Sequence, residues 1–243
     1  MHIKIFKDPD GIAEFLIHLL TEFLRKTAES GFIDVALSGG STPKAIFKVI
    51  ATEYAQKVDW RRFRFFWGDE RCVGPNHDES NYKMAADFLF NYISIPDENI
   101  FRIKGEDIHE VEAKRYEELI AGKLKLLNGI PQFDIILLGL GEDGHTASIF
   151  PDNLNLFNGK NLYAVAQNPD NLQKRITMTG KLINNASNIV FLVTGIKKAS
   201  ILRNIIRGND ESLIYPASYV KPASGEIFWL IDHEAASELE ELK

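Results

Sequence analysis

The chain has 243 residues, of which 45% are hydrophobic, 11% aromatic and 26% charged. These fractions are average for a soluble globular protein, and they exclude a disordered chain, a collagen and a coiled coil. Lysine and arginine number 28 against 34 aspartates and glutamates, which gives a formal net charge of −6. Because no basic tract offsets this balance, we expect no nucleic-acid partner.

The apolar stretch at residues 15–24 is interrupted by His18 and Glu22, and acidic residues precede it where a signal peptide requires positive charge. No other stretch approaches the roughly 18 apolar residues of a membrane span, so no membrane partner is expected. A single cysteine, Cys72, fits a reducing compartment. We therefore expect one cytoplasmic α/β domain over residues 1–243, either a monomer or a small homo-oligomer.

The spacing of apolar residues predicts helices and strands in alternation. The first helix is expected at 12–24, with Asp8 or Asp10 as its cap and Gly31 as its end. Further helices are expected at 45–54 (after Pro43, a preferred first helical residue), 81–92, 109–127, 197–207 and 234–242. Strands are expected at 32–37, 63–67, 133–138, 162–167, 175–179, 188–194 and 227–231.

Continuous apolar strands that alternate with helices predict a mostly parallel, Rossmann-like sheet with helices on both faces. Ligands of such sheets bind at the carboxyl ends of strands, where the strand order switches. Three glycine-rich or polar loops, at 38–42, 68–80 and 139–148, each follow a predicted strand directly. We therefore expect these three loops to converge on one crevice.

The loop Ser38-Gly39-Gly40-Ser41-Thr42 leads from a buried strand into a helix. Its glycines allow the backbone to approach a ligand, and its hydroxyls and helix N-terminal amides favour an anion such as phosphate. A tight turn with a Ser/Thr helix cap explains the composition about equally well. A third, minor interpretation is a nucleophile elbow at Ser38, with Asp232 and His233 as an awkwardly adjacent acid and base.

The loop at 139–148 contains the dinucleotide pattern G-x-G-x-x-G. Glu142 and Asp143 would place negative charge beside a pyrophosphate, and Pro151 follows too soon for the usual helix, so this function is disfavoured. A catalytic loop explains the segment better, because His145 suits general base chemistry near neutral pH and Asp143 can orient it. A single histidine in a loop more often has only a structural role, with its ring nitrogens hydrogen-bonded to the backbone. Here the glycines that follow an apolar strand favour a functional role.

The segment Gly68-Asp69-Glu70-Arg71 passes abruptly from an apolar strand to charged residues, which is typical of a binding edge. A short run of charged residues more often lies on a solvent-exposed surface without a binding function. His77 and Asp78 form no recognisable metal spacing with other ligands. The sequence therefore predicts no metal site.

Three segments together resemble the 6-phosphogluconolactonase family, within the wider group of glucosamine-6-phosphate isomerase/ribose-5-phosphate isomerase-like folds. They are LSGGSTP at 37–43, WGDERCV at 67–73 with Ser80-Asn81-Tyr82, and DIILLGLGEDGHTASIFP at 134–151. Weaker matches are RITMT at 175–179, Thr194-Gly195 with Lys197, and Pro216-Ala217-Ser218. The matches run from residue 37 to 218, so the resemblance covers nearly the whole chain.

The third segment also separates two branches of this group. Amino-sugar isomerase–deaminases read His-Ile-Ala-Phe-Asn-Glu-Pro, with a glutamate that transfers protons. Here the run is HTASIFP at 145–151, so Phe150 stands in place of that glutamate. A phenyl ring cannot transfer protons, and the resemblance therefore favours lactone hydrolysis over isomerisation.

The resemblance implies hydrolysis of 6-phospho-D-glucono-1,5-lactone without a cofactor. It implies that His145 activates water as a general base, that Asp143 orients His145, and that Asp69 binds sugar hydroxyls. It also implies a phosphate and substrate cradle formed by Ser38, Gly39, Gly40, Ser41, Thr42, Arg71, Arg175 and Lys197. The alternatives are an amino-sugar phosphate isomerase–deaminase and a non-catalytic sugar-phosphate sensor, although the chain has no room for a DNA-binding helix-turn-helix before residue 32.

Overall fold

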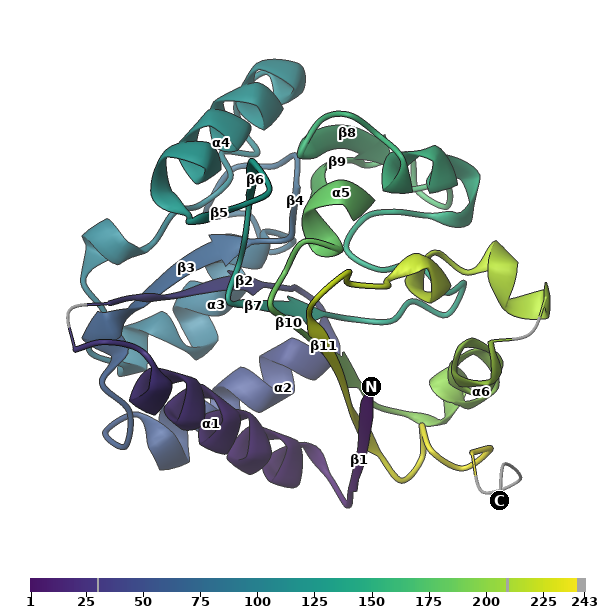
Figure 1. Ribbon diagram of the computed structural model, residues 1–243, viewed down its shortest axis with the longest axis horizontal. Helices are drawn as coiled ribbons and strands as arrows, with labels where there is room; N and C mark the ends of the chain where they lie inside the picture. The colour runs from purple at the N-terminus through teal and green to yellow at the C-terminus, as the bar shows by residue number, and fades with distance from the viewer. Residues whose placement is uncertain (30, 209, 240–243) are drawn as a thin grey trace.

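The computed structural model describes residues 1–29, 31–208 and 210–239, and its centre is a sheet of six parallel strands (Figure 1). The spatial order is β1-β11-β10-β7-β2-β3. These strands are β1 (His2–Phe6), β2 (Ile33–Leu37), β3 (Phe63–Trp67), β7 (Ile135–Leu138), β10 (Asn188–Val193) and β11 (Glu226–Asp232). Every residue of β2 and β7 is buried, as expected where both faces of a parallel sheet are covered. The predicted fold class is confirmed.

Helices cover both faces of this sheet. Figure 1 shows α1 and α2 on one side of it and α4 and α5 on the other. The helices are α1 (Pro9–Lys26), α2 (Ser41–Val49), α3 (Asn81–Phe88), α4 (His109–Lys123), α5 (Gly180–Ile183) and α6 (Ala199–Arg207). Asp8, one of the two predicted caps, accepts the N–H of Gly11 at 3.2 Å. At the other end, α1 stops at Lys26 with Thr27 as its C-cap, and not at Gly31. In the described part of the chain, no helix combines the length and apolarity needed to cross a membrane.

A second, antiparallel sheet consists of β4 (Asp69–Arg71), β9 (Lys174–Met178) and β8 (Tyr163–Gln167). β8 and β9 were predicted, but β4 lies inside the segment expected to be a polar loop. It becomes a strand because β9, about a hundred residues later in the chain, pairs with it as the antiparallel neighbouring strand. The register places Arg71 opposite Arg175 and Asp69 opposite Thr177.

Shorter elements complete the chain and change the ends of three predicted helices. The hairpin of β5 (Leu126–Leu127) and β6 (Ile130–Pro131) follows α4, so the helix predicted to reach residue 127 ends at Lys123. A π-helix at Ile50–Tyr54 continues α2, and a 3₁₀ turn at Phe90–Tyr92 follows α3. Other 3₁₀ turns lie at Trp60–Arg62, Asp97–Asn99, Pro151–Phe157, Ile196–Lys198, Asp210–Ile214 and Pro216–Tyr219.

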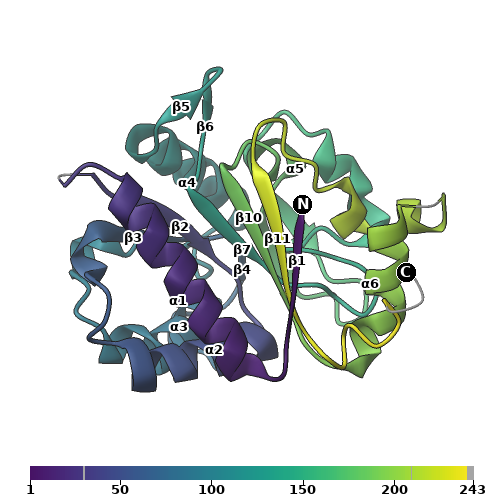
Figure 2. The same cartoon turned by 60° about the horizontal axis from the view of Figure 1, so that its bottom comes forward.

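The structure differs from the prediction near residues 2–6 and again after residue 233. Strand β1 was not predicted, because four of its five residues are exposed at the sheet edge and show no buried pattern; Figure 2 shows it beside β11. The helix predicted at 234–242 is wrong over 234–239, which form turns, and its remainder lies outside the described residues. The carboxylate of Asp232 accepts the N–H of Ala235 at 2.7 Å, which satisfies that amide in a turn conformation.

The strand order switches between β2 and β7. From β2 the chain continues to β3 on one side, whereas β7 lies on the other side of β2 and leads on towards β10 and β11. The loops that leave β2 and β7 therefore turn away from each other at adjacent strand ends, and such a point opens a crevice in α/β sheets.

Candidate active site

A cavity of about 610 Å³ lies beyond the carboxyl ends of β2, β3, β7 and β10. The three loops expected to converge all contribute to its wall. The predicted site residues that line it are Ser38, Gly39, Gly40, Ser41, Thr42, Asp69, Arg71, Asp143, His145 and Arg175. The remaining predicted residue, Lys197, does not line it.

His145 and Asp143 form a hydrogen-bonded pair in this cavity. The distance between His145 Nδ1 and Asp143 Oδ1 is 2.6 Å, and the same oxygen accepts the backbone N–H of His145 at 3.0 Å. Burial raises the pKa of the Asp143 carboxyl, but its bonds with His145 outweigh burial and hold that pKa below its usual value. With Nδ1 engaged by Asp143, Nε2 is the ring nitrogen left to accept a proton.

Two glycines of this loop, Gly141 and Gly144, are required by close packing. A Cβ on Gly141 would lie 2.1 Å from His145 Nδ1. Gly144 has φ +81°, and a Cβ there would lie 2.5 Å from Cδ1 of Tyr215. Ala217 also donates its N–H to the carbonyl of Gly144 at 3.0 Å, so the segment at 215–217 supports the loop from outside the cavity. The second glycine of the G-x-G-x-x-G pattern thus makes room for the His145–Asp143 pair, and the third makes room for Tyr215. A Cβ on the first, Gly139, would be in ordinary contact with Ser38 Oγ at 3.8 Å.

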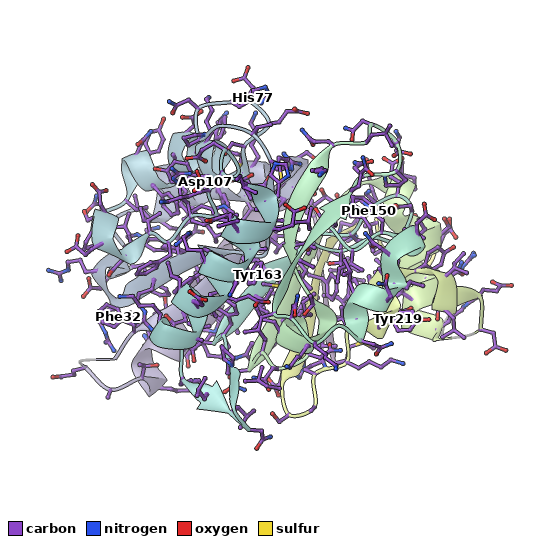
Figure 3. All side chains as sticks on the ribbon, turned by 90° about the horizontal axis from the view of Figure 1, so that it is seen from above. Phe32, His77, Asp107, Phe150, Tyr163 and Tyr219 are labelled. Atoms are coloured by element: carbon purple, nitrogen blue, oxygen red, sulfur yellow. The ribbon has the colours of Figure 1, made fainter. Side chains whose placement is uncertain are left out.

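Phe150 lies against the imidazole of His145, with ring centroids 4.7 Å apart, and it also lines the cavity. No proton-transferring carboxylate can therefore occupy this position beside the imidazole. Figure 3 shows His77 at the outer edge of the molecule, well separated from Phe150. Among the described residues, no group of three or more histidine, cysteine, aspartate or glutamate side chains is arranged to hold a metal ion.

The loop after β2 presents the start of a helix to the cavity. Its N-cap is Gly40, with φ +104°, and no side chain caps the helix, so the Ser/Thr cap interpretation is wrong. The amides of the first helical turn have no partner within the helix, which suits an anion. Gly39 is required here because a Cβ would lie 1.8 Å from Oδ1 of Asn81. Asn81, which sequence reasoning did not select, lines the cavity and donates Nδ2–H to the carbonyl of Asp69 at 2.9 Å.

Arg71 and Arg175 lie opposite each other on β4 and β9 and both line the cavity. The Nε atom of each is buried and has no hydrogen-bond partner within the described residues. Burial lowers the pKa of Arg175, whose Nη1 is 3.9 Å from Oδ2 of the buried Asp69. Asp69 Oδ2 accepts a hydrogen bond from Ser148 Oγ at 2.6 Å. The antiparallel sheet thus brings two cations and one carboxylate to one wall.

The structure corrects the prediction for Lys197. Its side chain is 75% exposed and lies 3.6 Å from the carboxylate of Glu142, whereas the next residue, Lys198, lines the cavity. Burial lowers the pKa of Lys198. Lys197 and Lys198 belong to a 3₁₀ turn, in which successive residues point about 120° apart, so only one of the two lysines can face inward. The spacing of apolar residues contained part of this signal. Lys198 lies three and four residues before the buried Ile201 and Leu202, whereas Lys197 has helical spacing to Ile201 alone.

The serine triad is not assembled. The Ser38 hydroxyl donates only to the carbonyl of Gly39, at 3.3 Å, within the described residues. Asp232 accepts backbone N–H groups of Gly195 and Ala235, and His233 is exposed. The nucleophile-elbow interpretation is therefore wrong.

Comparisons with known proteins show the family to which the chain belongs. A family model described as glucosamine-6-phosphate isomerases/6-phosphogluconolactonase matches residues 7–229. A 6-phosphogluconolactonase of Haemophilus influenzae is 45% identical over 204 residues, covering 84% of this chain and 86% of that protein. One from Nostoc is 38% identical over 94% of this chain and 93% of its own length.

Solved structures of similar proteins have the same fold as this chain. The 6-phosphogluconolactonase of Trypanosoma brucei superposes with a TM-score of 0.88 at 28% identity, over 98% of each chain. A monomeric glucosamine-6-phosphate deaminase superposes with a TM-score of 0.81 over 98% of this chain and 100% of its own. Its identity is 22%, so this likeness is evidence for a common fold and for nothing further.

Proposed function

Because the chain belongs to the family of glucosamine-6-phosphate isomerases and 6-phosphogluconolactonases, we propose that it hydrolyses 6-phospho-D-glucono-1,5-lactone to 6-phospho-D-gluconate. Relatives that share 45% of their residues with it over 84% of the chain carry the lactonase name. The observation that carries the proposal is the His145–Asp143 pair with Phe150 packed on its imidazole. This arrangement offers one base for water and lacks the second acid of the isomerase–deaminases at that position.

In the proposed reaction, His145 Nε2 accepts a proton from a water molecule as the water oxygen attacks the lactone carbonyl. Negative charge then develops on the carbonyl oxygen, where backbone amides of the glycine loop can donate hydrogen bonds. When the bond between the carbonyl carbon and the ring oxygen breaks, His145 returns the proton to that oxygen, which leaves as a hydroxyl group. Asp143 stabilises the imidazolium between the two transfers.

The substrate phosphate is proposed to bind between the loop at 38–42 and three cations, Arg71, Arg175 and Lys198. The unpaired Nε atoms of both arginines and the free amides of α2 are donors that suit a dianionic ester. Lys198 takes the role expected for Lys197, because it lines the cavity. Asp69 is proposed to bind a sugar hydroxyl, since its carboxylate lines the same wall.

We also propose that the reaction needs neither metal nor cofactor and takes place in the cytoplasm, and that residues 1–243 act as one domain. An isomerase–deaminase and a sugar-phosphate sensor remain as competing functions. Phe150 argues against the first, and the intact His145–Asp143 pair, which a sensor does not need, argues against the second.

The decisive assay follows acid release from freshly prepared 6-phosphogluconolactone, corrected for spontaneous hydrolysis and run with EDTA. We expect a rate well above the spontaneous one, and no ammonia from glucosamine 6-phosphate. Loss of activity in EDTA that a divalent ion restores would contradict the metal-free mechanism. Ammonia release without lactone hydrolysis would instead support the deaminase.

A further inference from the structure

Asp232, at the end of β11, holds the turn that leaves the neighbouring strand β10. Its two carboxylate oxygens accept the backbone N–H of Gly195 at 3.1 and 3.0 Å. The two strands are parallel partners up to Val193 and Ile231, so the carboxylate reaches sideways across the sheet to the first residues of the next loop. A second contact, from the N–H of Ala235 at 2.7 Å, fixes the carboxylate itself.

The turn held in this way carries two residues of the cavity wall. Gly195 has φ +95°, and it begins the 3₁₀ turn that places Lys198 at the start of α6, with the Lys198 N–H donating to the Gly195 carbonyl at 3.1 Å. On the other side of Gly195, Thr194 Oγ1 lies 2.6 Å from Oγ1 of Thr42 in the loop after β2. The orientation of the Gly195 peptide therefore sets the direction of both Thr194 and Lys198.

Asp232 does not itself line the cavity. A carboxylate that only stabilised the fold would affect every substrate alike, because it would change how much folded protein is present. A carboxylate that sets the direction of Lys198 would affect only substrates whose charge Lys198 contacts.

We infer that Asp232 is a positioning residue, which orients the turn at Gly195 so that Lys198 and Thr194 face the phosphate of the substrate. This inference rests on the proposed function, since that function supplies the phosphate. It gives a role to an aspartate that the sequence offered only as the acid of a triad.

The test compares Asp232→Ala and Asp232→Asn with wild type on 6-phosphogluconolactone and on unphosphorylated glucono-1,5-lactone. For Asp232→Ala we expect KM for the phosphorylated lactone to rise about 10-fold, as for loss of one charge-assisted contact, with kcat and the slower turnover of glucono-1,5-lactone unchanged. Asp232→Asn keeps one acceptor oxygen and should show a smaller rise. The matched control is Asp8→Ala, which also removes an aspartate that accepts a glycine N–H but lies at the start of α1. It should lower Tm and leave both KM values unchanged.

A double variant tests whether Asp232 acts through Lys198. On a Lys198→Ala background, Asp232→Ala should raise KM little further, because effects on one shared interaction are not additive. Full additivity, or equal losses on the two lactones, would overturn the inference.

A crystal structure of each Asp232 variant gives a readout that does not depend on turnover. We expect the Lys198 side chain to leave the cavity wall in Asp232→Ala, and its unchanged position would overturn the inference. If wild type hydrolysed neither lactone, the proposed function would fail and this structure would still decide the role of Asp232. If Asp232→Ala did not fold, Asp232→Asn would supply both measurements.

Discussion

The loop at 139–150 and the turn at 194–198 leave neighbouring strands and line one cavity, but different contacts hold them in shape. The loop is fixed mainly from within: Asp143 bonds to His145 two residues away, and the N–H of Gly141 donates to the carbonyl of His145 at 2.8 Å. The turn is fixed from outside, by Asp232 on another strand. The proposed base and its orienting acid thus form a local unit, whereas the turn that carries the proposed binding cation, Lys198, is held by a distant part of the chain.

The largest expected effect is in the local unit. His145→Ala should lower kcat about 10²- to 10⁴-fold, the usual contribution of a positioned acid–base group. Ser38→Ala is the control variant. It should lower kcat far less than His145→Ala does, because Ser38 is proposed to bind the substrate and not to attack it. Steady-state kinetics on the phosphorylated lactone measure both. A covalent acyl-enzyme trapped on Ser38 would reverse the assignment.

The second prediction concerns the turn and separates two adjacent lysines. Lys198→Ala should lower kcat/KM for the phosphorylated lactone about 10- to 100-fold, because a hydrogen bond between charged partners contributes about 1.5–3 kcal/mol. Lys197→Ala should change it little, since that side chain is mostly exposed. The ratio of kcat/KM values for the phosphorylated and unphosphorylated lactones measures the difference. A larger effect from Lys197 would restore the role that the sequence alone suggested for it.

Glycine substitutions can show how tightly each part of the cavity wall is packed. Gly40→Ala should cost about 1–3 kcal/mol of unfolding free energy from its backbone conformation alone, because a Cβ at Gly40 meets no atom within 4 Å. Gly144→Ala should cost more, since the new Cβ also requires Tyr215 to move. Urea unfolding gives both free energies. Equal losses of unfolding free energy would mean that Tyr215 does not support the loop at 139–150.

The smallest expected effect is on the pH dependence of stability. The folded-state pKa of Asp143 lies below its ordinary value of 3.8, so its ionised form stabilises the folded protein. Wild type should therefore exceed Asp143→Asn in stability above that value, and the difference should vanish as pH falls through the lowered pKa. The Asp143 side chain is 40% exposed, so solvent keeps the difference under about 1 kcal/mol. Thermal unfolding from pH 2 to 7 measures it, and a difference that grows towards low pH would contradict the pairing.

Local patterns were sufficient to predict the buried strands of the sheet and the loops that follow them. The His145–Asp143 pair could be predicted for the same reason, because its members are two residues apart. Features that depend on distant partners could not be predicted in this way. β4 needs β9 to become a strand, Asn81 reaches the cavity only because Gly39 leaves room for it, and β1 is exposed on one edge.

The pairing of β1 with β11 has a consequence for the kinetics of folding. In the described part of the chain, residues 2–6 pair with residues 226–232, so the two strands that meet at this edge of the sheet are far apart in sequence. Contacts between such distant residues form slowly, because a long stretch of chain must be ordered before the two strands can meet. We therefore expect β1 to join the sheet late in folding, after β2 and β3, whose sequence separation is short.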